Sequence, residues 1–267
     1  MAVKHRLIAL ACACALSACG GSGSSGGGAP QPEGVSPAGL WSGVDPISGQ
    51  DLAGVILADG EFRFYRDDGT QYVGSVATTS SGQVTGSFEG DAEYDFAFPD
   101  GSINGQGALT GWLDPINSQP QTFSISMSFT DANGTTTGSD QWAFSALYNQ
   151  PVTVAALVGT YSLFSHPGVV LTVNADGTVT ASQDPSTGCV FSGTISQVDA
   201  AHPAYDFSGS FTNCQGNSQP FNGVQLSGLA FALPLPNSGG SGYQLIAMLT
   251  GDLSGSPRAV TYVANAN

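Results

Sequence analysis

The chain has almost no positive charge. Only five of its 267 residues are lysine or arginine, against 20 aspartate and glutamate residues. Lys4 is the single lysine, and the only arginines after residue 18 are Arg63, Arg66 and Arg258. So acidic a surface repels phosphate backbones, which excludes nucleic-acid binding. The lack of lysine after residue 18 also excludes Schiff-base chemistry there.

Histidine is scarce as well. His166 and His202 are the only histidines after residue 18, and each directly precedes a proline. This context predicts exposed loop positions. No motif beside them marks a nucleophile. We therefore predict no catalytic residue, no cofactor and no metal site, and we expect that the chain is not an enzyme. A hydrolase whose catalytic groups meet only in the folded chain is an alternative.

The first 19 residues have the order of an export signal. Lys4 and Arg6 precede an apolar run over residues 7–16, which is too short to span a bilayer. The run ends in Leu16-Ser17-Ala18-Cys19. This sequence resembles the lipobox of bacterial lipoproteins, which implies that residues 1–18 are a signal peptide and that Cys19 is lipidated. A plain secretory signal with a chance cysteine is the alternative.

The lipobox resemblance implies a location in the cell envelope. Acyl chains on Cys19, at about 0.8 kcal/mol per buried CH₂, would hold the chain on a membrane permanently. Gly20 follows this cysteine, where an aspartate would resemble an inner-membrane retention signal, so we expect the outer membrane. Whether the protein faces the periplasm or the surface stays open. Residues 19–37 are rich in Gly, Ser and Pro and predict a flexible tether after the lipid.

The remaining cysteines predict one disulfide. Two of the five cysteines lie in the signal peptide and Cys19 is the lipid site, which leaves Cys189 and Cys214. An even pair in an oxidising compartment predicts a bridge. The two cysteines lie at the ends of expected strands over residues 190–197 and 205–211, and neighbouring strands would bring them together. A redox or metal role is the alternative, although two cysteines without nearby histidines make a poor zinc site.

Beyond residue 37 the sequence predicts an all-β fold. Short segments of alternating polarity are separated by turns such as Asp59-Gly60 and Asn133-Gly134, which are strong hairpin signals. We predict two tandem antiparallel domains of the meander or barrel-like type. The first is an acidic domain over residues 38–150, and the second is a disulfide-containing domain over residues 151–267. One larger barrel or sandwich of about 230 residues is the alternative.

Two further resemblances concern the architecture. Gly159-Thr160-Tyr161, with the turn Asn174-Ala175-Asp176-Gly177, looks like the opening hairpins of avidin-like and lipocalin-like barrels. Gly39-Leu40-Trp41-Ser42-Gly43 and the segment Gly188-Cys189-Val190-Phe191-Ser192-Gly193-Thr194 are similar to segments of a group of β-rich proteobacterial lipoproteins. All three tryptophans lie in the first region, so avidin-type biotin binding is not implied. These resemblances imply architecture and not a mechanism.

Three alternating carboxylates are candidate cation ligands. Asp91, Glu93 and Asp95 would share one face of an extended strand, with apolar residues between them on the other face. They could bind calcium or a cationic partner. The alternative, which we favour, is a solvated face that keeps the sheet soluble. Arg63 and Arg66, three residues apart, would face opposite sides and pair with nearby carboxylates.

Aromatic residues of the first region are expected in its core, and the alternative is that some line a barrel mouth that holds an apolar ligand. They are Trp41, Trp112, Trp142, Phe62, Phe64, Phe96 and Phe98.

The sequence thus indicates a lipid-anchored, non-catalytic binding or structural module. Its expected partners are the membrane, through the lipid, and an envelope protein or cationic partner bound mainly by the first domain. A lipocalin-like carrier of a small apolar ligand is the alternative function, and a hydrolase is a weaker one.

Overall fold

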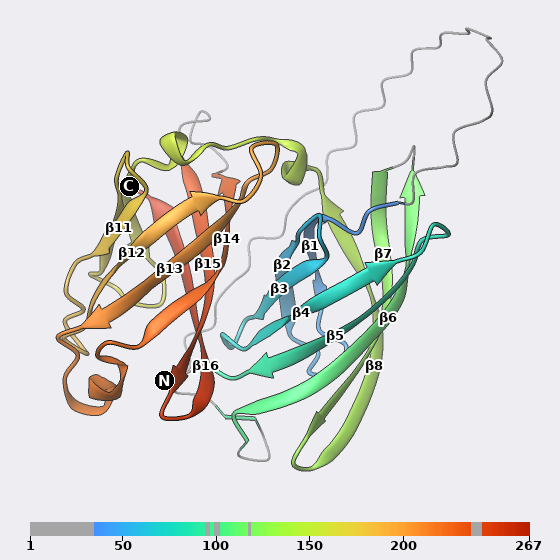
Figure 1. Ribbon diagram of the computed structural model, residues 1–267, viewed down its shortest axis with the longest axis horizontal. Helices are drawn as coiled ribbons and strands as arrows, with labels where there is room; N and C mark the ends of the chain where they lie inside the picture. The colour runs from blue at the N-terminus through green and yellow to red at the C-terminus, as the bar shows by residue number, and fades with distance from the viewer. Residues whose placement is uncertain (1–34, 94–96, 99–101, 117–118, 236–241) are drawn as a thin grey trace, which may run out of the picture.

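The computed structural model describes residues 35–93, 97–98, 102–116, 119–235 and 242–267. This part of the chain forms two closed antiparallel barrels of eight strands each, one after the other in the sequence (Figure 1). The predicted all-β class with two tandem domains is confirmed. The signal peptide, Cys19 and the tether through residue 34 lie outside the described residues.

The first barrel is an up-and-down meander. Each strand pairs with the next, and Leu40 of the first strand pairs with Ser145 of the last to close the barrel. Its strands are β1 (Gly39–Val44), β2 (Asp51–Ile56), β3 (Glu61–Arg66), β4 (Gln71–Thr78), β5 (Gln83–Asp91), β6 (Asn104–Ile116), β7 (Gln119–Asp131) and β8 (Gly134–Ser145).

The second barrel repeats this plan, and it closes where Leu163 pairs with Ala264. Its strands are β9 (Gly159–Leu163), β10 (Val170–Val173), β11 (Thr178–Ala181), β12 (Val190–Gln197), β13 (Ala204–Thr212), β14 (Gln225–Pro234), β15 (Tyr243–Leu253) and β16 (Ser256–Ala266). Short 3₁₀ helices are η1 (Ala146–Asn149), η2 (Val154–Leu157) and η3 (Gly216–Phe221). In the described residues no helix is both long and apolar enough to cross a membrane.

Aromatic side chains fill the interior of the first barrel. An eight-stranded barrel has an interior just wide enough for side chains to fill. Trp41, Trp142 and Phe64 are fully buried there, and Phe64 and Trp142 lie with ring centroids 4.7 Å apart. Glycines on neighbouring strands make room for them, since a Cβ on Gly43 of β1 would lie 2.3 Å from the ring of Trp142 on β8. The prediction of core aromatics is confirmed for these residues and for Phe62 and Phe98.

Trp112 is an exception, because it is 49% exposed on the outer face of β6. The next residue, Leu113, is buried in the barrel, and so is Leu109, four residues before it on the same face of the strand. Since side chains alternate along a strand, Trp112 must point outward. The expectation that it belongs to the core is wrong. Phe96 lies outside the described residues.

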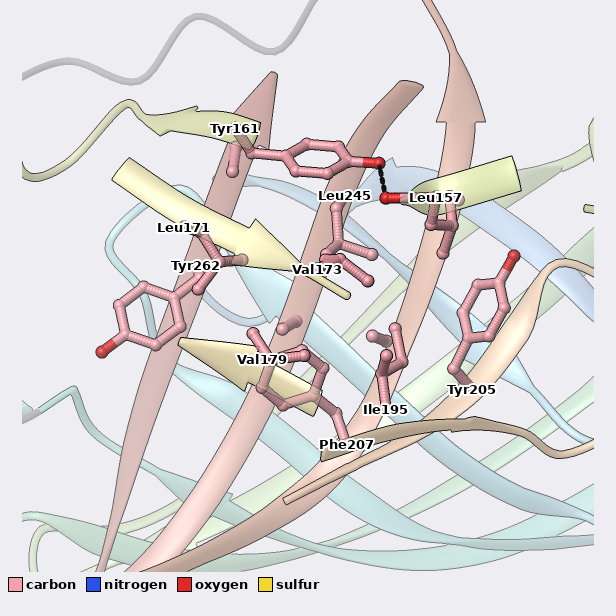
Figure 2. Close-up of a cluster of buried hydrophobic side chains, with 14 of the residues drawn as sticks. Leu157, Tyr161, Leu171, Val173, Val179, Ile195, Tyr205, Phe207, Leu245 and Tyr262 are labelled. Atoms are coloured by element: carbon pink, nitrogen blue, oxygen red, sulfur yellow. Dashed lines mark hydrogen bonds between the residues drawn. The ribbon is translucent and has the colours of Figure 1, made fainter. Parts of the chain in front are cut away.

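The second barrel has smaller interior side chains and one plugged end. Leu157 of η2 inserts at that end, and the Tyr161 hydroxyl donates to the Leu157 carbonyl at 2.8 Å (Figure 2). The Tyr205 hydroxyl donates to the carbonyl of Val152 at 2.6 Å. Burial raises the pKa of Tyr161 to about 12, so this hydroxyl keeps its proton and remains a donor. The segment that joins the barrels therefore closes this end.

The barrels pack against each other through the outer faces of β2 and β3 and of β14 and β15. Between them lies an apolar cluster with members from both barrels. Its buried members are Leu40, Val55, Leu57, Tyr65, Tyr148, Ala204, Leu229, Phe231, Ile246 and Met248. Hydrogen bonds at its edge also cross the interface: Arg63 Nη1 donates to Thr250 Oγ1 at 3.2 Å, and Asn104 Nδ2 to the Pro257 carbonyl at 2.9 Å. This packing holds first-barrel turns beside the open end of the second barrel.

Candidate ligand-binding site

A pocket of about 570 Å³ lies at the unplugged end of the second barrel. This volume is in the range of small-molecule sites in proteins. The pocket has an apolar floor from the barrel interior and polar walls from loops of both barrels. The lining residues are Asp67, Asp68, Glu93, Leu163, Ser165, His166, Val169, Leu171, Ala181, Ser182, Asp184, Ser186, Thr187, Cys189, Phe191, Phe211, Ser218, Phe221, Ala259, Val260 and Tyr262.

The floor is formed by inward-facing aromatic residues. Phe191 is the second residue of β12, Phe211 is the second-last residue of β13, and Tyr262 lies within β16. The Phe191 and Tyr262 rings lie with centroids 6.0 Å apart, and Phe211 contacts Phe221 of η3 at 5.8 Å. The rings give the floor of the pocket a largely apolar surface on which an apolar ligand group could pack.

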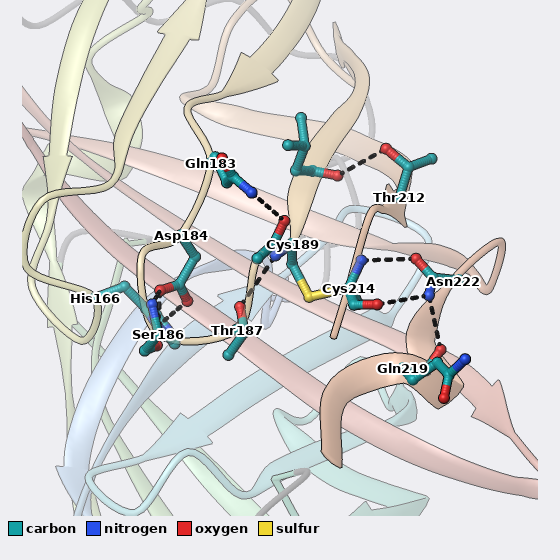
Figure 3. Close-up of a disulfide and its surroundings, with 12 residues drawn as sticks. His166, Gln183, Asp184, Ser186, Thr187, Cys189, Thr212, Cys214, Gln219 and Asn222 are labelled. Atoms are coloured by element: carbon teal, nitrogen blue, oxygen red, sulfur yellow. Dashed lines mark hydrogen bonds and ion pairs between the residues drawn. A yellow bond between two sulfur atoms is a disulfide. The ribbon is translucent and has the colours of Figure 1, made fainter. Parts of the chain in front are cut away.

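The Cys189–Cys214 disulfide fixes one wall of the pocket, and the predicted bridge is confirmed. It links the residue before β12 to the loop after β13. The Gln215 amide donates to the Thr187 carbonyl at 2.8 Å, and Asn222 bonds to both backbone polar groups of Cys214 (Figure 3). The bridge therefore joins the β11–β12 loop, which carries Asp184 and Thr187, to the segment that carries η3.

Asp184 is the best-held carboxylate of this wall. Its Oδ1 accepts from the Ser186 amide at 2.8 Å and from Ser186 Oγ at 2.7 Å, and its Oδ2 lies 3.1 Å from His166 Nδ1 (Figure 3). Burial alone would raise the pKa of Asp184. The hydrogen bonds from Ser186 and Thr187 and the nearby His166 outweigh that effect, so its pKa is held below the ordinary value. The group is ionised at neutral pH.

The opposite wall comes from the first barrel. Asp67 and Asp68 lie in the β3–β4 turn, and Glu93 follows β5, where it forms an isolated bridge with Ala259 at the start of β16. Arg66 binds Asp68 through two nitrogens, at 3.2 and 2.5 Å. Although burial alone would raise the pKa of Asp68, the bonds from Arg66 lower it. Four carboxylates thus surround an apolar opening.

Two buried hydroxyl groups face this acidic rim. Burial raises the pKa of Tyr262, and the carboxylates of Asp184 and Glu93 raise it further. The Tyr262 side chain therefore stays neutral. Ser165 Oγ is buried and has no hydrogen-bond partner among the described residues. A polar ligand group would supply the partner that Ser165 lacks, since an unpaired buried hydroxyl is costly.

The His166–Asp184 pair has the form of the base and its orienting carboxylate in a catalytic triad, but it lacks a nucleophile. In a triad the serine hydroxyl bonds to the histidine. Here the Ser186 hydroxyl bonds to the Asp184 carboxylate, and no serine is bonded to His166 in the described part of the chain. This arrangement holds the loop and orients the carboxylate.

Two of the three carboxylates that the sequence groups together, Asp91 and Glu93, do not share a strand face, because Asp91 ends β5 and Glu93 lies beyond it. β5 ends at Asp91, which is only 3% exposed and whose Oδ1 accepts from Asn104 Nδ2 at 2.8 Å. Burial raises the pKa of Asp91. The interpretation of a solvated face is therefore wrong for Asp91, because the second barrel covers this end of the strand. Glu93 lies on the pocket wall, and Asp95, like Cys19, lies outside the described residues.

The basic residues and His202 also have defined places. Arg63 and Arg66 do face opposite sides: Arg63 is at the interface between the barrels, and Arg66 turns into the first barrel, 3.2 Å from Asp45.

His202 is not simply exposed. Its ring stacks on Tyr148 with centroids 4.0 Å apart, and Nδ1 lies 2.9 Å from the Tyr148 carbonyl oxygen. It thus packs at the joining segment, away from the pocket.

No cluster of three or more histidine, cysteine or acidic side chains is arranged to hold a metal ion in the residues that the structure describes. The carboxylates of the pocket rim are spread along two walls. They are not gathered around one point, as the ligands of a metal ion are.

Sequence reasoning missed this pocket, although it weighed a barrel mouth as a ligand site in the first region. The pocket lies in the second barrel and takes three of its carboxylates from the first. The sequence feature that could have indicated the pocket is the cysteine pair. A disulfide at the ends of two neighbouring strands predicts that the loops there are held in place, as the wall of a binding site requires.

Comparison of the chain with known protein families, with curated proteins and with solved structures found no match.

Proposed function

We propose that this chain is a lipid-anchored protein of the bacterial cell envelope that binds a small amphiphilic cation and performs no catalysis. The anchor rests on the Leu16-Ser17-Ala18-Cys19 sequence. The Cys189–Cys214 bridge agrees with an oxidising compartment. The outer membrane is the proposed site of attachment, through lipid on Cys19.

One observation carries the ligand proposal: an apolar pocket is rimmed by four carboxylates. The apolar part of a ligand would pack on Leu171, Phe191 and Phe211. Burial of this apolar surface would contribute about 25 cal/mol of binding free energy per Å². Asp184 and Glu93 stand on opposite walls above it. An ammonium group on a short hydrocarbon would satisfy both regions at once. A carboxylate in the same place would be repelled.

Titration calorimetry with three matched probes tests this proposal. Octylammonium, octanol and octanoate share one chain and differ in charge. They are titrated into residues 19–267 carrying Cys19→Ser, expressed without the signal peptide, a form that needs no detergent. We expect octylammonium to bind tightest, and its affinity to fall as salt rises, because exposed charges are screened within about 10 Å at 0.1 M.

Two variants separate the apolar and the charged contributions. Ala181→Trp should fill the pocket and abolish binding of octylammonium and octanol alike. Glu93→Gln should weaken octylammonium while leaving octanol unchanged. Asp206→Asn, which neutralises an exposed carboxylate on β13 away from the pocket, is the matched control. Equal affinity for octanoate, or full binding by Ala181→Trp, would refute the proposal.

A further inference from the structure

The outer face of β5–β8 in the first barrel carries one exposed indole among uncharged polar side chains. Across the four strands, the register aligns Gln83, Trp112, Ser124 and Gln141 in one row. All four are exposed, and Trp112 is 49% exposed. About half of Trp112 is therefore in water on a barrel wall, flanked by the Gln83 amide on one side and the Ser124 hydroxyl on the other. Isolated small apolar residues on a surface need no explanation, but an indole exposes far more apolar area.

The rows below Trp112 continue the same chemistry. They consist of serine, threonine, glutamine and alanine, with a single charged residue, Glu89, in the last row. Charge is sparse on this face, although the chain has 20 acidic residues: besides Glu89, only Asp114, exposed on β6 two residues after Trp112, lies on these strands close to the indole. Serine and threonine hydroxyls both donate and accept hydrogen bonds, and glutamine amides do the same. The face can exchange hydrogen bonds with a partner rich in hydroxyls without a need for opposite charge.

A groove begins where these rows end. It has a volume of about 770 Å³ and lies between Gln106, Ser128 and Thr130 of this face and residues 255–257 of the β15–β16 turn in the second barrel. Gln106 is on the same strand as Trp112, six residues earlier, and the two lie roughly 20 Å apart at 3.4 Å per residue. The indole and the groove are therefore two ends of one continuous strip.

We propose that this strip binds a chain of an uncharged polysaccharide. The C–H face of a pyranose ring stacks on the exposed side of the Trp112 indole by dispersion and apolar burial. Its hydroxyls bond to the serine, threonine and glutamine rows, and the chain continues into the groove. The length of the strip suits several linked sugars and not a single one. Glu89 and Asp131 at the groove repel anionic glycans.

The chemistry disfavours other partners. A protein interface needs a continuous apolar centre, and this face has one indole. Insertion at a membrane surface needs a wide apolar face. This site is separate from the pocket of the second barrel, and the proposal does not depend on the ligand of that pocket.

The test is depletion of the full-length protein, kept in a detergent without a sugar headgroup, by insoluble cellulose and by chitin. We expect retention on at least one of these uncharged polysaccharides and none on calcium alginate gel, which is anionic. Trp112→Ala should weaken retention about tenfold or more, as removal of a central aromatic contact does at other binding surfaces. Phe164→Ala, which truncates a residue that is 50% exposed on the second barrel, is the matched control and should bind fully.

Two more measurements keep the outcome clear. Ser126→Asp, one row below Trp112, should weaken retention without touching the indole, and thermal melting should show Trp112→Ala and Ser126→Asp folded. Retention on neither polysaccharide would overturn the proposal, as would retention unchanged in Trp112→Ala. Binding to phosphatidylcholine vesicles that is lost in Trp112→Ala, with no polysaccharide binding, would instead make Trp112 a membrane contact and would also overturn it.

Discussion

The side-chain amide of Gln71, on β4 of the first barrel, donates a hydrogen bond to Thr261 Oγ1, on β16 of the second, at 2.8 Å. The same nitrogen donates to the Val260 carbonyl at 3.0 Å, and Thr261 Oγ1 donates to the Gly69 carbonyl at 3.2 Å. Gln71 and Thr261 are both buried. Because Gly69 belongs to the turn that carries Asp67 and Asp68, this network holds the acidic turn over the pocket.

Gln71→Leu removes this link while keeping a similar volume. It leaves buried polar partners in the second barrel without their donor, so we expect a loss of about 1–3 kcal/mol in the free energy of unfolding. Octylammonium affinity should fall as well, because the acidic wall is no longer fixed. Gln141→Leu, at an exposed glutamine of the same barrel, is the control for chemical denaturation and calorimetry. Equal effects of the two variants would contradict this role for Gln71.

Removal of the disulfide should act on stability and on the pocket together. In the double variant Cys189→Ser, Cys214→Ser, the unfolded chain gains the freedom of a loop that spans 25 residues in sequence. The expected loss is about 3 kcal/mol of unfolding free energy. The loop that carries Asp184 would also lose its tie to η3, so octylammonium should bind more weakly than to the parent protein.

Non-reducing peptide mass spectrometry of the parent must first find the two cysteines joined. Reduction of the parent by dithiothreitol under native conditions provides the second comparison, since it breaks the same bond without a substitution. If the double variant is as stable as the parent and binds octylammonium equally, the bridge does not shape the pocket.

The alternation of residues was enough to predict most strand faces. In β3 it separates Phe62 and Phe64, which are buried inside the barrel, from Arg63 and Tyr65, which meet the second barrel. The same rule places Trp112 on the outer face if the next residue, Leu113, is taken as an interior residue of the strand. Hydrophobicity alone favoured the core, and this was the error.

Contacts between the barrels could not be read from the sequence. The alternation of polar and apolar residues predicts an exposed strand position for Asp91. In the structure β5 ends at Asp91, and the amide of Ala259 in the second barrel donates to the Ala92 carbonyl at 3.1 Å. The pocket depends on the same packing, because Asp68 and Asp184 come from different barrels and are 116 positions apart in the sequence. Only the docked arrangement brings them to one opening.

The lipid anchor can be tested by one substitution. Cys19→Ser removes the sulfur that would be acylated, so we expect the protein to leave the membrane fraction or to stay unprocessed. Cell fractionation and labelling with a radioactive or clickable palmitate provide the two measurements. Cys189→Ser is the matched cysteine control and should keep both the label and the membrane location. Membrane retention and acyl labelling of Cys19→Ser at parent levels would exclude the anchor.

Asp184 should make stability depend on pH in a defined direction. Its folded pKa lies below the ordinary value, which is about 3.9 in unfolded chains. The ionised carboxylate therefore stabilises the fold at all pH values above about 4, and this contribution disappears as the pH falls through the lowered folded pKa. Asp184→Asn should be less stable than the parent at pH 7, and the difference should shrink as the pH approaches 2.

Urea denaturation of the parent and Asp184→Asn at several pH values between 7 and 2 measures this difference. Asp206→Asn again provides the control, because its exposed carboxylate has no comparable set of bonds in the described structure. Ser186→Ala is the informative partner variant, since it removes the hydroxyl that donates to Asp184 at 2.7 Å. It should raise the pKa of Asp184 and move the loss of stability toward higher pH. A difference between parent and Asp184→Asn that stays constant with pH would show that the carboxylate contributes through packing alone.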